Sequence, residues 1–340
     1  MKRSTSLLAI AVPIVLGVVA LMLASPAFSY LNDFTAPSGG GTPFMDMWPG
    51  TPQWNLNPTL PPGKITGTQT DLRNVVTASF NSWKAAPNVS NIVSGISEGP
   101  DSIVNNENTP HPGINLVCFN CSGANFTTDG TLAITLTTAT IQGNQSVLSQ
   151  ADIIFNPAPQ GMCFIAELNA TAPPAAGTCP NPADTPQDLQ TVLTHEVGHF
   201  FGLDHSAVVA AMMFPFAPPL RTTLSYDDVA GISSTYPGAQ IIPVGSISGT
   251  VTLGGAGVFG AHVFANSTTS ATPYPIPIRK TPIGTLTRPN GTYTINAVPQ
   301  DTYTVYAEPL DLPVSNSDVS TYAPAWGQTS VQTNFTTRSF

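Results

Sequence analysis

The stretch HEVGHFFGLDH, residues 195–205, holds three of the five histidines in a chain of 340 residues. On a helix, His195 and His199 lie one turn apart, so both imidazoles point to the same side. Gly202 tolerates a left-handed backbone, which lets the chain leave the helix and bring back His205. Three neutral imidazoles bind one Zn²⁺ and leave the fourth coordination position open for water, as in catalytic zinc sites. The spacing therefore predicts a catalytic zinc site.

The glutamate beside the first histidine predicts the kind of reaction. Glu196 is placed to reach a water on the zinc rather than the zinc itself. Zinc lowers the pKa of a bound water toward about 7 and polarises a carbonyl group. We expect Glu196 to act as general base on that water and to pass the proton to the leaving amine. The competing interpretation, core histidines with local hydrogen bonds, leaves the glutamate and the glycine unexplained.

The same stretch resembles the HExxHxxGxxH motif of the metzincin metallopeptidases at every defined position. A serine, Ser206, follows the third histidine, and in this it resembles the matrixin branch of the family. AAMMFP, 210–215, resembles the Met-turn of that family. This resemblance implies that Met213 lies beneath the zinc as a soft, apolar support. LSYDDVAGISSTY, 224–236, resembles the closing helix of the matrixins, and ADIIFN, 151–156, is similar to the strand beside the cleft.

The resemblance covers residues 47–237 and implies a metzincin-like α+β catalytic domain, in which a twisted mixed sheet holds a zinc-binding active-site helix. It implies a zinc endopeptidase with protein or peptide substrates. Phe214 and Pro215, which follow the Met-turn methionine, are expected in the wall of the specificity pocket. Phe214 stands where tyrosine is common in the family, so no tyrosine there can act as a fifth ligand. No PRCG-type cysteine precedes the domain, which argues against latency through a thiol on the zinc.

We expect a single zinc ion. Outside the motif only His111 and His262 remain, on different predicted domains, and each is expected to be an ordinary loop or strand histidine. Calcium stays open, because no Asp-rich loop is apparent.

A rival interpretation is a catalytically silent secreted adhesion or binding protein on a metalloprotease scaffold. Such a scaffold is expected to lose the general base or a ligand, whereas this chain retains Glu196 and all three histidines. The intact set favours the enzyme.

The first thirty residues are typical of a targeting segment. Two basic residues open it, Leu7–Ala24 carries no charge, and Ala27 and Ser29 are the small residues before a cleavage site. We expect a signal peptide over residues 1–29 and a secreted, extracellular protein. The alternative is an uncleaved membrane anchor with the rest of the chain facing outward, because an apolar run of this length nearly spans a bilayer.

An oxidising compartment permits disulfide bonds among the four cysteines, Cys118, Cys121, Cys163 and Cys179. Four cysteines allow three connectivities, and the sequence does not choose among them. We expect local closure, in which Cys118 pairs with Cys121 and Cys163 with Cys179. A zinc or redox pair at CFNC is the alternative, disfavoured because the chain has no second CxxC.

Charge excludes one class of partner. The chain has 10 basic and 19 acidic residues, a net charge of −9, and no cluster of lysine or arginine. Because nucleic-acid binding needs a basic footprint, we exclude it.

Two helices and a run of strands are expected to position the site. Residues 70–84 place apolar side chains at three- and four-residue spacings, which predicts an amphipathic helix. Residues 187–202 are apolar on most sides, as is typical of a buried helix. A first strand is expected within 47–58. Residues 103–158 hold β-rich runs separated by Gly, Asn and Asp, which predicts further strands.

Composition divides the chain into a flexible leader (30–44), the catalytic domain (45–238), a linker (239–245) and an all-β sandwich domain (246–340). Short alternating strands with glycine and PNG turns predict the sandwich. It resembles the carboxypeptidase regulatory-like (transthyretin-like) domain, for which two roles stay open: binding of substrate or a surface, or stabilisation only. A chain that ends near Gly238 is expected to fold and to cleave peptides.

Overall fold

The computed structural model describes residues 2–7, 32–37, 41–126, 130–270, 272–274, 277–310, 313–319 and 321–339. The predicted signal peptide, 1–29, lies outside this range apart from β1, Lys2–Leu7, whose backbone pairs antiparallel with β8, Ala133–Gln142. The cleavage site at Ala27 and Ser29 also lies outside the described residues. The signal peptide therefore stays a prediction.

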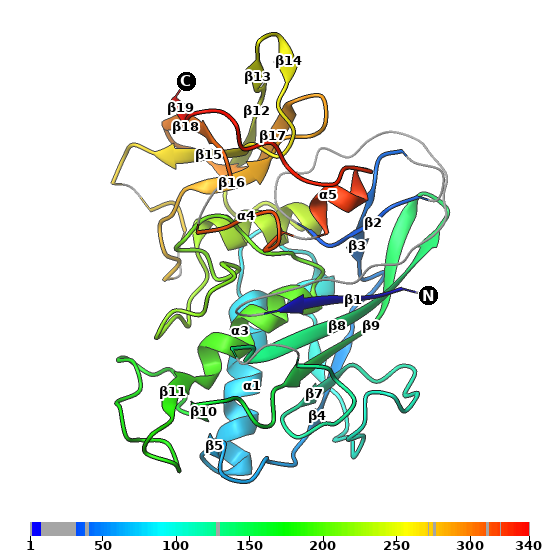
Figure 1. Ribbon diagram of the computed structural model, residues 1–340, viewed down its shortest axis with the longest axis vertical. Helices are drawn as coiled ribbons and strands as arrows, with labels where there is room; N and C mark the ends of the chain where they lie inside the picture. The colour runs from blue at the N-terminus through cyan, green and yellow to red at the C-terminus, as the bar shows by residue number, and fades with distance from the viewer. Residues whose placement is uncertain are drawn as a thin grey trace.

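A mixed sheet of eight strands forms the centre of the described structure (Figure 1). Besides β1 and β8 it contains β2 Phe34–Thr35, β3 Phe44–Met47, β4 Gln53–Asn57, β6 Ser97–Glu98, β7 Leu116–Cys118 and β9 Gln145–Phe155. Its main path runs β1-β8-β9-β7-β4-β6, with β3 beside β9 and β2 beside β3. Strands β4, β6, β7 and β9 run parallel, whereas β8 is antiparallel to β9. The mixed sheet matches the expected α+β class.

The helix predicted over residues 70–84 is confirmed as α1, Gln69–Lys84. A capping box closes its start: the Thr68 hydroxyl accepts from the Asp71 N–H, and the Asp71 carboxylate accepts from the Thr68 N–H. The apolar side chains that predicted the helix are all buried, namely Leu72, Val75, Val76, Phe80 and Trp83. They belong to the same apolar cluster as residues of the sheet, so α1 covers one face of it.

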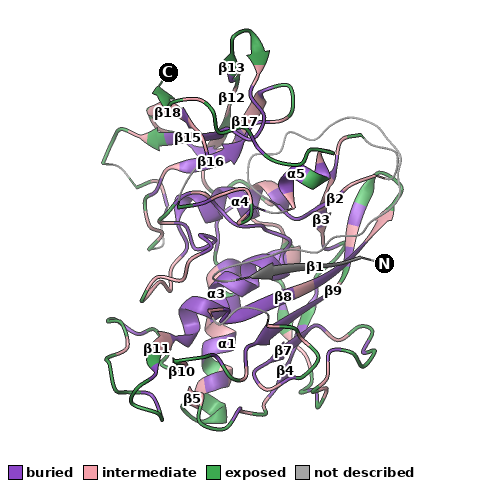
Figure 2. Cartoon of the chain, in the orientation of Figure 1, coloured by how far each residue is buried: buried purple, intermediate pink, exposed green. Residues whose placement is uncertain are grey.

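The second predicted helix, 187–202, is confirmed as α3, Leu189–Phe200, and every one of its residues is buried (Figure 2). The Asp188 carboxylate caps its first turn. The helix packs against α1, β8 and β9. The rings of Phe80 and Phe200 meet edge to face at 5.3 Å between centroids. The helix that carries two of the predicted zinc ligands is therefore fixed between a second helix and the sheet.

A smaller parallel sheet of order β11-β10-β5 precedes α3 in the chain: β5 Ile65–Thr66, β10 Met162–Ile165 and β11 Thr185–Asp188. A disulfide bond joins Cys163, in β10, to Cys179 in the segment between β10 and β11. A second bond joins Cys118 to Cys121 at the end of β7. Both are local pairings, of the kind expected from the sequence.

The closing segment forms α4, Tyr226–Thr235, and a further short helix, α2, spans Asn91–Ser94. Ser225 and Asp228 form the capping box that their spacing predicts at the start of α4. Beyond its end, the Tyr236 hydroxyl donates to the Phe201 carbonyl oxygen at 2.8 Å. This bond ties the end of α4 to the end of α3.

The C-terminal part consists of small antiparallel sheets, drawn yellow to red in Figure 1. Its strands are β12 Val244–Thr250, β13 Thr252–Leu253, β14 Ala256–Gly257, β15 His262–Ser267, β16 Ile283–Leu286, β17 Thr292–Pro299, β18 Tyr303–Glu308 and β19 Arg338–Ser339. A short helix not expected from the sequence, α5, spans Tyr322–Ala325. The assignment to a sandwich family stays a prediction.

The parts on either side of the predicted linker, 239–245, are packed against each other. The Gly284 N–H donates to the buried carboxylate of Asp227, in the first turn of α4, at 2.7 Å. The rings of Tyr226 and Tyr274 lie 4.8 Å apart. The predicted domain boundaries stay predictions. Because these contacts join the two parts, removing one part would expose buried groups of the other.

Within the described ranges, no helix has both the length and the apolar character needed to cross a membrane. The apolar run Leu7–Ala24, on which the predicted signal peptide rests, lies almost entirely outside those ranges.

Candidate metal centre and catalytic residues

Three imidazoles meet at the end of α3. The Nε2 atoms of His195 and His199 lie 3.0 Å apart, as expected for residues one helical turn apart. The ring of His205 lies 5.3 Å from that of His195 and 4.9 Å from that of His199. One ring nitrogen from each lies within 4.8 Å of the others, and all three side chains are buried. The structure thus brings together the three histidines that the sequence singled out.

Each imidazole is oriented by a backbone carbonyl at its other nitrogen. The Nδ1 contacts are His195 to Met212 O at 2.8 Å, His199 to Leu203 O at 2.6 Å and His205 to Asp318 O at 2.6 Å. Because a carbonyl only accepts, each Nδ1 carries the hydrogen and each Nε2 presents a lone pair. Nε2 of His205 has no hydrogen-bond partner among the described residues. Three buried lone pairs directed at one point fit a tetrahedral zinc ion with an open position.

Burial supports the neutral form that a ligand needs. Burial lowers the pKa of His195 well below its usual value, and so does the charge of His205 nearby. The same causes, burial first and then the neighbouring imidazoles, lower the pKa of His199 well below its usual value. Neutral imidazole is the form that binds zinc.

The turn after α3 brings His205 back, as the glycine predicted. Gly202 has φ +80°, and its N–H donates to the His199 carbonyl oxygen at 2.8 Å. The Leu203 N–H donates to the Gly198 carbonyl oxygen at 3.1 Å, which completes a Schellman motif. A Cβ at position 202 would lie 2.2 Å from a backbone oxygen of Asp46, so only glycine fits.

Met213 lies directly against the ligand helix. It is fully buried, and a Cβ added at Gly198 would meet its sulfur at 2.1 Å. The missing side chain at Gly198, between His195 and His199, therefore makes room for the methionine. This contact is consistent with the expected role of Met213 as an apolar support.

Two acidic residues of α4 hold the chain that follows α3, one at the Met-turn and one beside the third histidine. The Asp228 carboxylate accepts from the N–H groups of Met212 at 2.8 Å and Met213 at 3.1 Å. The neighbouring Asp227 accepts from the Ser206 hydroxyl, next to the third histidine. Sequence reasoning found Asp228 only as a helix cap and missed Asp227. The available signal was the pair of adjacent carboxylates in the first turn of a buried helix.

The predicted general base, Glu196, is completely buried beside the imidazoles. Its Oε2 accepts from the Thr135 hydroxyl at 2.6 Å, whereas Oε1 has no hydrogen-bond partner among the described residues. Burial raises the pKa of Glu196 to about 8, and the Thr135 hydrogen bond opposes that shift. Thr135 is therefore a positioning residue that leaves one carboxylate oxygen available. The sequence offers no signal for it, because β8 and α3 are linked only by the fold.

The C-terminal part reaches the third ligand. The Asp318 carbonyl oxygen orients His205, and the Thr321 hydroxyl donates to Asp204 Oδ2 at 2.6 Å. Asp204 Oδ1 in turn accepts from the His205 N–H at 2.7 Å. More than a hundred residues separate these partners in the chain, so no motif predicts them. Residues of both parts of the molecule therefore build the histidine centre.

The expected pocket wall, Phe214 and Pro215, is buried. Phe214 belongs to an apolar cluster that includes Phe259 and Tyr322 of the C-terminal part, and its ring lies 5.6 Å from that of Phe216. Its place in a specificity pocket stays a prediction.

The two remaining histidines lie away from the triad. His262, on β15, places Nδ1 3.0 Å from Glu308 Oε1. His111 places Nε2 3.3 Å from Asp152 Oδ2, and this hydrogen bond raises the pKa of His111 to about 9 although burial opposes it. His111 also lies near the carboxylate of Glu107.

Comparison with known proteins shows what the segment around this centre is similar to. Residues 125–237 match the family model described as Matrixin. Metalloendoproteinase 4-MMP of Arabidopsis thaliana is 26% identical over 220 residues, 59% of this chain and 53% of that protein. Metalloendoproteinase 1 of Glycine max is 40% identical over 58 residues, 16% of this chain and 19% of that protein. Karilysin of Tannerella forsythia is 39% identical over 49 residues, 14% of this chain and 10% of that protein.

The chain thus spans about half the length of the Arabidopsis protein and a smaller share of the other two. The matched family segment contains β8, β9, α3, the turn after α3, the Met-turn and α4. It therefore includes the three histidines and Glu196, whereas Asp318 and Thr321 lie outside it. Over residues 125–237 the chain is therefore similar to the matrixin family, and this segment contains the three histidines of the candidate metal centre.

Proposed function

We propose that this protein is a secreted zinc-dependent endopeptidase that cleaves peptide bonds in proteins or peptides. The observation that carries the proposal is the convergence of three imidazole Nε2 atoms beside a buried glutamate with one oxygen available. His195, His199 and His205 would hold a single catalytic zinc at this centre. The family match and the metalloendoproteinase relatives support the same activity.

The chemistry divides between the metal and the chain. Zinc supplies a Lewis acid that polarises the scissile carbonyl and makes water more acidic. Glu196 takes a proton from the attacking water at Oε1 and passes it to the leaving amine. Thr135 holds the other carboxylate oxygen, which keeps Glu196 in one orientation during both transfers. The burial of these groups strengthens every electrostatic interaction among them.

Glu196→Gln tests the proposal, because it keeps the size of the side chain and removes the proton acceptor. Cleavage of a denatured protein substrate should fall by about 10²–10⁴-fold, the usual contribution of general base catalysis. Zinc at the triad should stay at the parent level, since Glu196 is not a ligand. Cleavage by the parent should stop with a chelator and return with added zinc.

The outcomes separate the enzyme from its rival. Retained proteolysis in a zinc-loaded Glu196→Gln protein would contradict general-base catalysis by Glu196. Loss of both activity and triad zinc would instead make Glu196 a ligand. A folded, zinc-loaded parent that cleaves no substrate would favour a catalytically silent binding protein.

Secretion and the C-terminal role belong to the same proposal. We expect the signal peptide to be removed before Tyr30, which N-terminal sequencing of the exported protein would show. The C-terminal part would form a transthyretin-like sandwich that attaches substrate or a surface. Its contact with His205 adds a role at the metal centre.

A further inference from the structure

A second group of metal-ligating side chains lies on the other face of the main sheet. On β9, Ala151, Ile153 and Phe155 face the helices, whereas Asp152 and Ile154 point to the opposite side. One ligand atom each from Asp152, His111 and Glu107 lie within 4.8 Å of one another. This group is separated from the catalytic histidines by the thickness of the sheet, so it belongs to a different site.

The three side chains are removed from solvent. Glu107 is 3% exposed, His111 5% and Asp152 1%. Carboxylates are costly to bury unless they are paired or bind a metal. A divalent cation carries the charge that balances two carboxylates, and it leaves the imidazole in its neutral ligand form. Burial and charge therefore both suit a bound dication.

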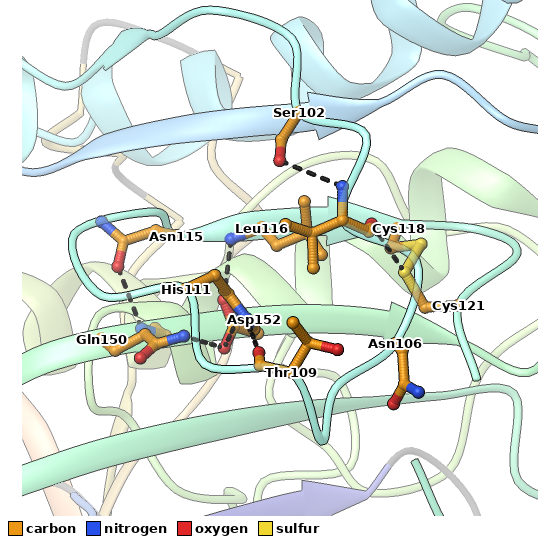
Figure 3. Close-up of polar contacts among 12 residues, drawn as sticks. Ser102, Asn106, Thr109, His111, Asn115, Leu116, Cys118, Cys121, Gln150 and Asp152 are labelled. Carbon is orange, nitrogen blue, oxygen red and sulfur yellow. Dashed lines mark hydrogen bonds and ion pairs between the residues drawn. A yellow bond between two sulfur atoms is a disulfide. The ribbon is translucent and has the colours of Figure 1, made fainter. Parts of the chain in front are cut away.

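His111 and Asp152 are held in a ligand-like arrangement (Figure 3). The His111 Nδ1 lies 2.7 Å from the Thr109 carbonyl oxygen, so this nitrogen carries a hydrogen, and Nε2 lies 3.3 Å from Asp152 Oδ2. Without a metal, Nε2 donates to that carboxylate; a bound ion would replace this proton and take the Nε2 lone pair as a ligand. Asp152 Oδ1 accepts from the Leu116 N–H at 2.8 Å, and Oδ2 accepts from the Gln150 amide at 2.6 Å. A backbone partner at the second imidazole nitrogen is the usual support of a metal-binding histidine.

The loop that carries Glu107 is tied down. The Glu107 N–H donates to the Ser122 carbonyl oxygen, and the Ser122 N–H donates to the Asn105 carbonyl oxygen, both at 2.8 Å. The disulfide bond between Cys118 and Cys121 closes the neighbouring turn, as Figure 3 shows. The site is therefore built on a sheet strand and a cross-linked loop, and it needs no large movement to bind an ion.

We propose that Glu107, His111 and Asp152 bind a second divalent ion of the zinc type, which holds the 105–111 loop on the sheet. The imidazole favours a transition-metal ion, because calcium and magnesium take oxygen ligands almost exclusively. The ion is structural, since its ligands are closed from solvent on the face away from Glu196. This proposal goes beyond the catalytic zinc and replaces the expectation of a single zinc ion.

The test counts zinc in the full-length chain after metal removal and reloading with Zn²⁺ alone. We expect about two ions per chain for the parent and about one for His199→Ala, which disrupts only the catalytic centre. His111→Ala should also hold about one ion, and its remaining ion should support peptide cleavage. His262→Ala is the matched control, because it removes another buried histidine paired with a carboxylate and should keep about two ions.

A second variant and a spectroscopic measurement test the site where His111→Ala folds poorly. Glu107→Gln is close to isosteric and should also lose one ion while its circular dichroism spectrum stays that of the parent. In the His199→Ala protein, cobalt replacing the remaining ion should show a ligand-field spectrum of nitrogen and oxygen ligands that disappears in Glu107→Gln. A parent with one ion, held by the catalytic triad, would overturn the proposal. Failure of the catalytic proposal would appear separately, as a zinc-loaded parent without peptidase activity.

Discussion

Replacement of Thr321 by valine is expected to weaken zinc binding at the catalytic centre, although Thr321 is not a ligand. Its hydroxyl donates to buried Asp204 at 2.6 Å, and Asp204 accepts from the N–H of His205. Three residues earlier, the Asp318 carbonyl orients the His205 ring. Thr321→Val keeps the shape of the side chain and removes the donor that holds this segment at the metal centre.

The structure sets the size of the effect. A hydrogen bond to a carboxylate contributes about 1.5–3 kcal/mol to stability. Loss of an outer partner of a metal-binding histidine weakens metal binding about 10–100-fold. Because Thr321→Val leaves the Asp318 carbonyl in the chain, we expect the lower end, a loss of about tenfold or about 1.4 kcal/mol.

The assay measures peptide cleavage in zinc-buffered solutions and gives the free zinc concentration at which activity is half-maximal. This value reports the catalytic ion alone, because only that ion supports cleavage. Thr321→Ser keeps the hydroxyl and should match the parent. Thr329→Val, at an exposed position of the same segment, is the matched control. Urea unfolding of each zinc-free protein measures the stability change separately.

One result would refute the reasoning. Thr321→Val could unfold at a lower urea concentration than the parent and yet regain half of its peptide cleavage at the same free zinc concentration as the parent. In that case the segment stabilises the fold without holding His205. If Thr321→Ser behaves like Thr321→Val, the hydroxyl is not the group that matters.

Three further predictions follow from the packing around the site. Gly198→Ala should lower the free energy of unfolding by about 1–3 kcal/mol, because the added methyl group would overpack against the Met213 sulfur. Gly50→Ala is the control, since a Cβ there has no atom within 4 Å, and thermal unfolding compares the two variants. Ser225→Ala should cost about 0.5–2 kcal/mol in urea unfolding through loss of the α4 cap. A chain that ends at Gly238 should be poorly soluble and bind zinc weakly, contrary to the expectation from composition; a soluble, fully active fragment would restore the independent domain.

The sequence predicted the local structure around the metal centre well, because that structure depends on short-range patterns. The apolar spacing of 70–84 matches α1, and the buried helix at 187–202 matches α3. The glycine at 202 has the left-handed backbone that its type allows. The Ser225 and Asp228 capping box is formed as their spacing requires. Each of these features is decided within one or two helical turns of chain.

Long-range contacts account for what sequence reasoning missed. Thr135 meets Glu196 only because α3 packs against β8 in the folded protein, and no spacing in the chain predicts that contact. His111, Glu107 and Asp152 also meet only in the folded protein, because they are separated along the chain and no motif spacing relates them. Hydrophobic periodicity indicates which face of an element is buried, but it does not identify the residue across the interface.

The contact between the C-terminal part and His205 changes how the motif should be understood. HExxHxxGxxH specifies three ligands and a base, and its first two histidines take their backbone acceptors from the matched family segment, at Met212 and Leu203. The third takes its acceptor from Asp318, outside that segment. Since the orientation of a ligand sets how well it binds metal, we expect the zinc affinity of this centre to depend on this contact with the C-terminal part. On this reasoning, catalytic activity would require the C-terminal part to be folded against the catalytic part, which the chain ending at Gly238 tests.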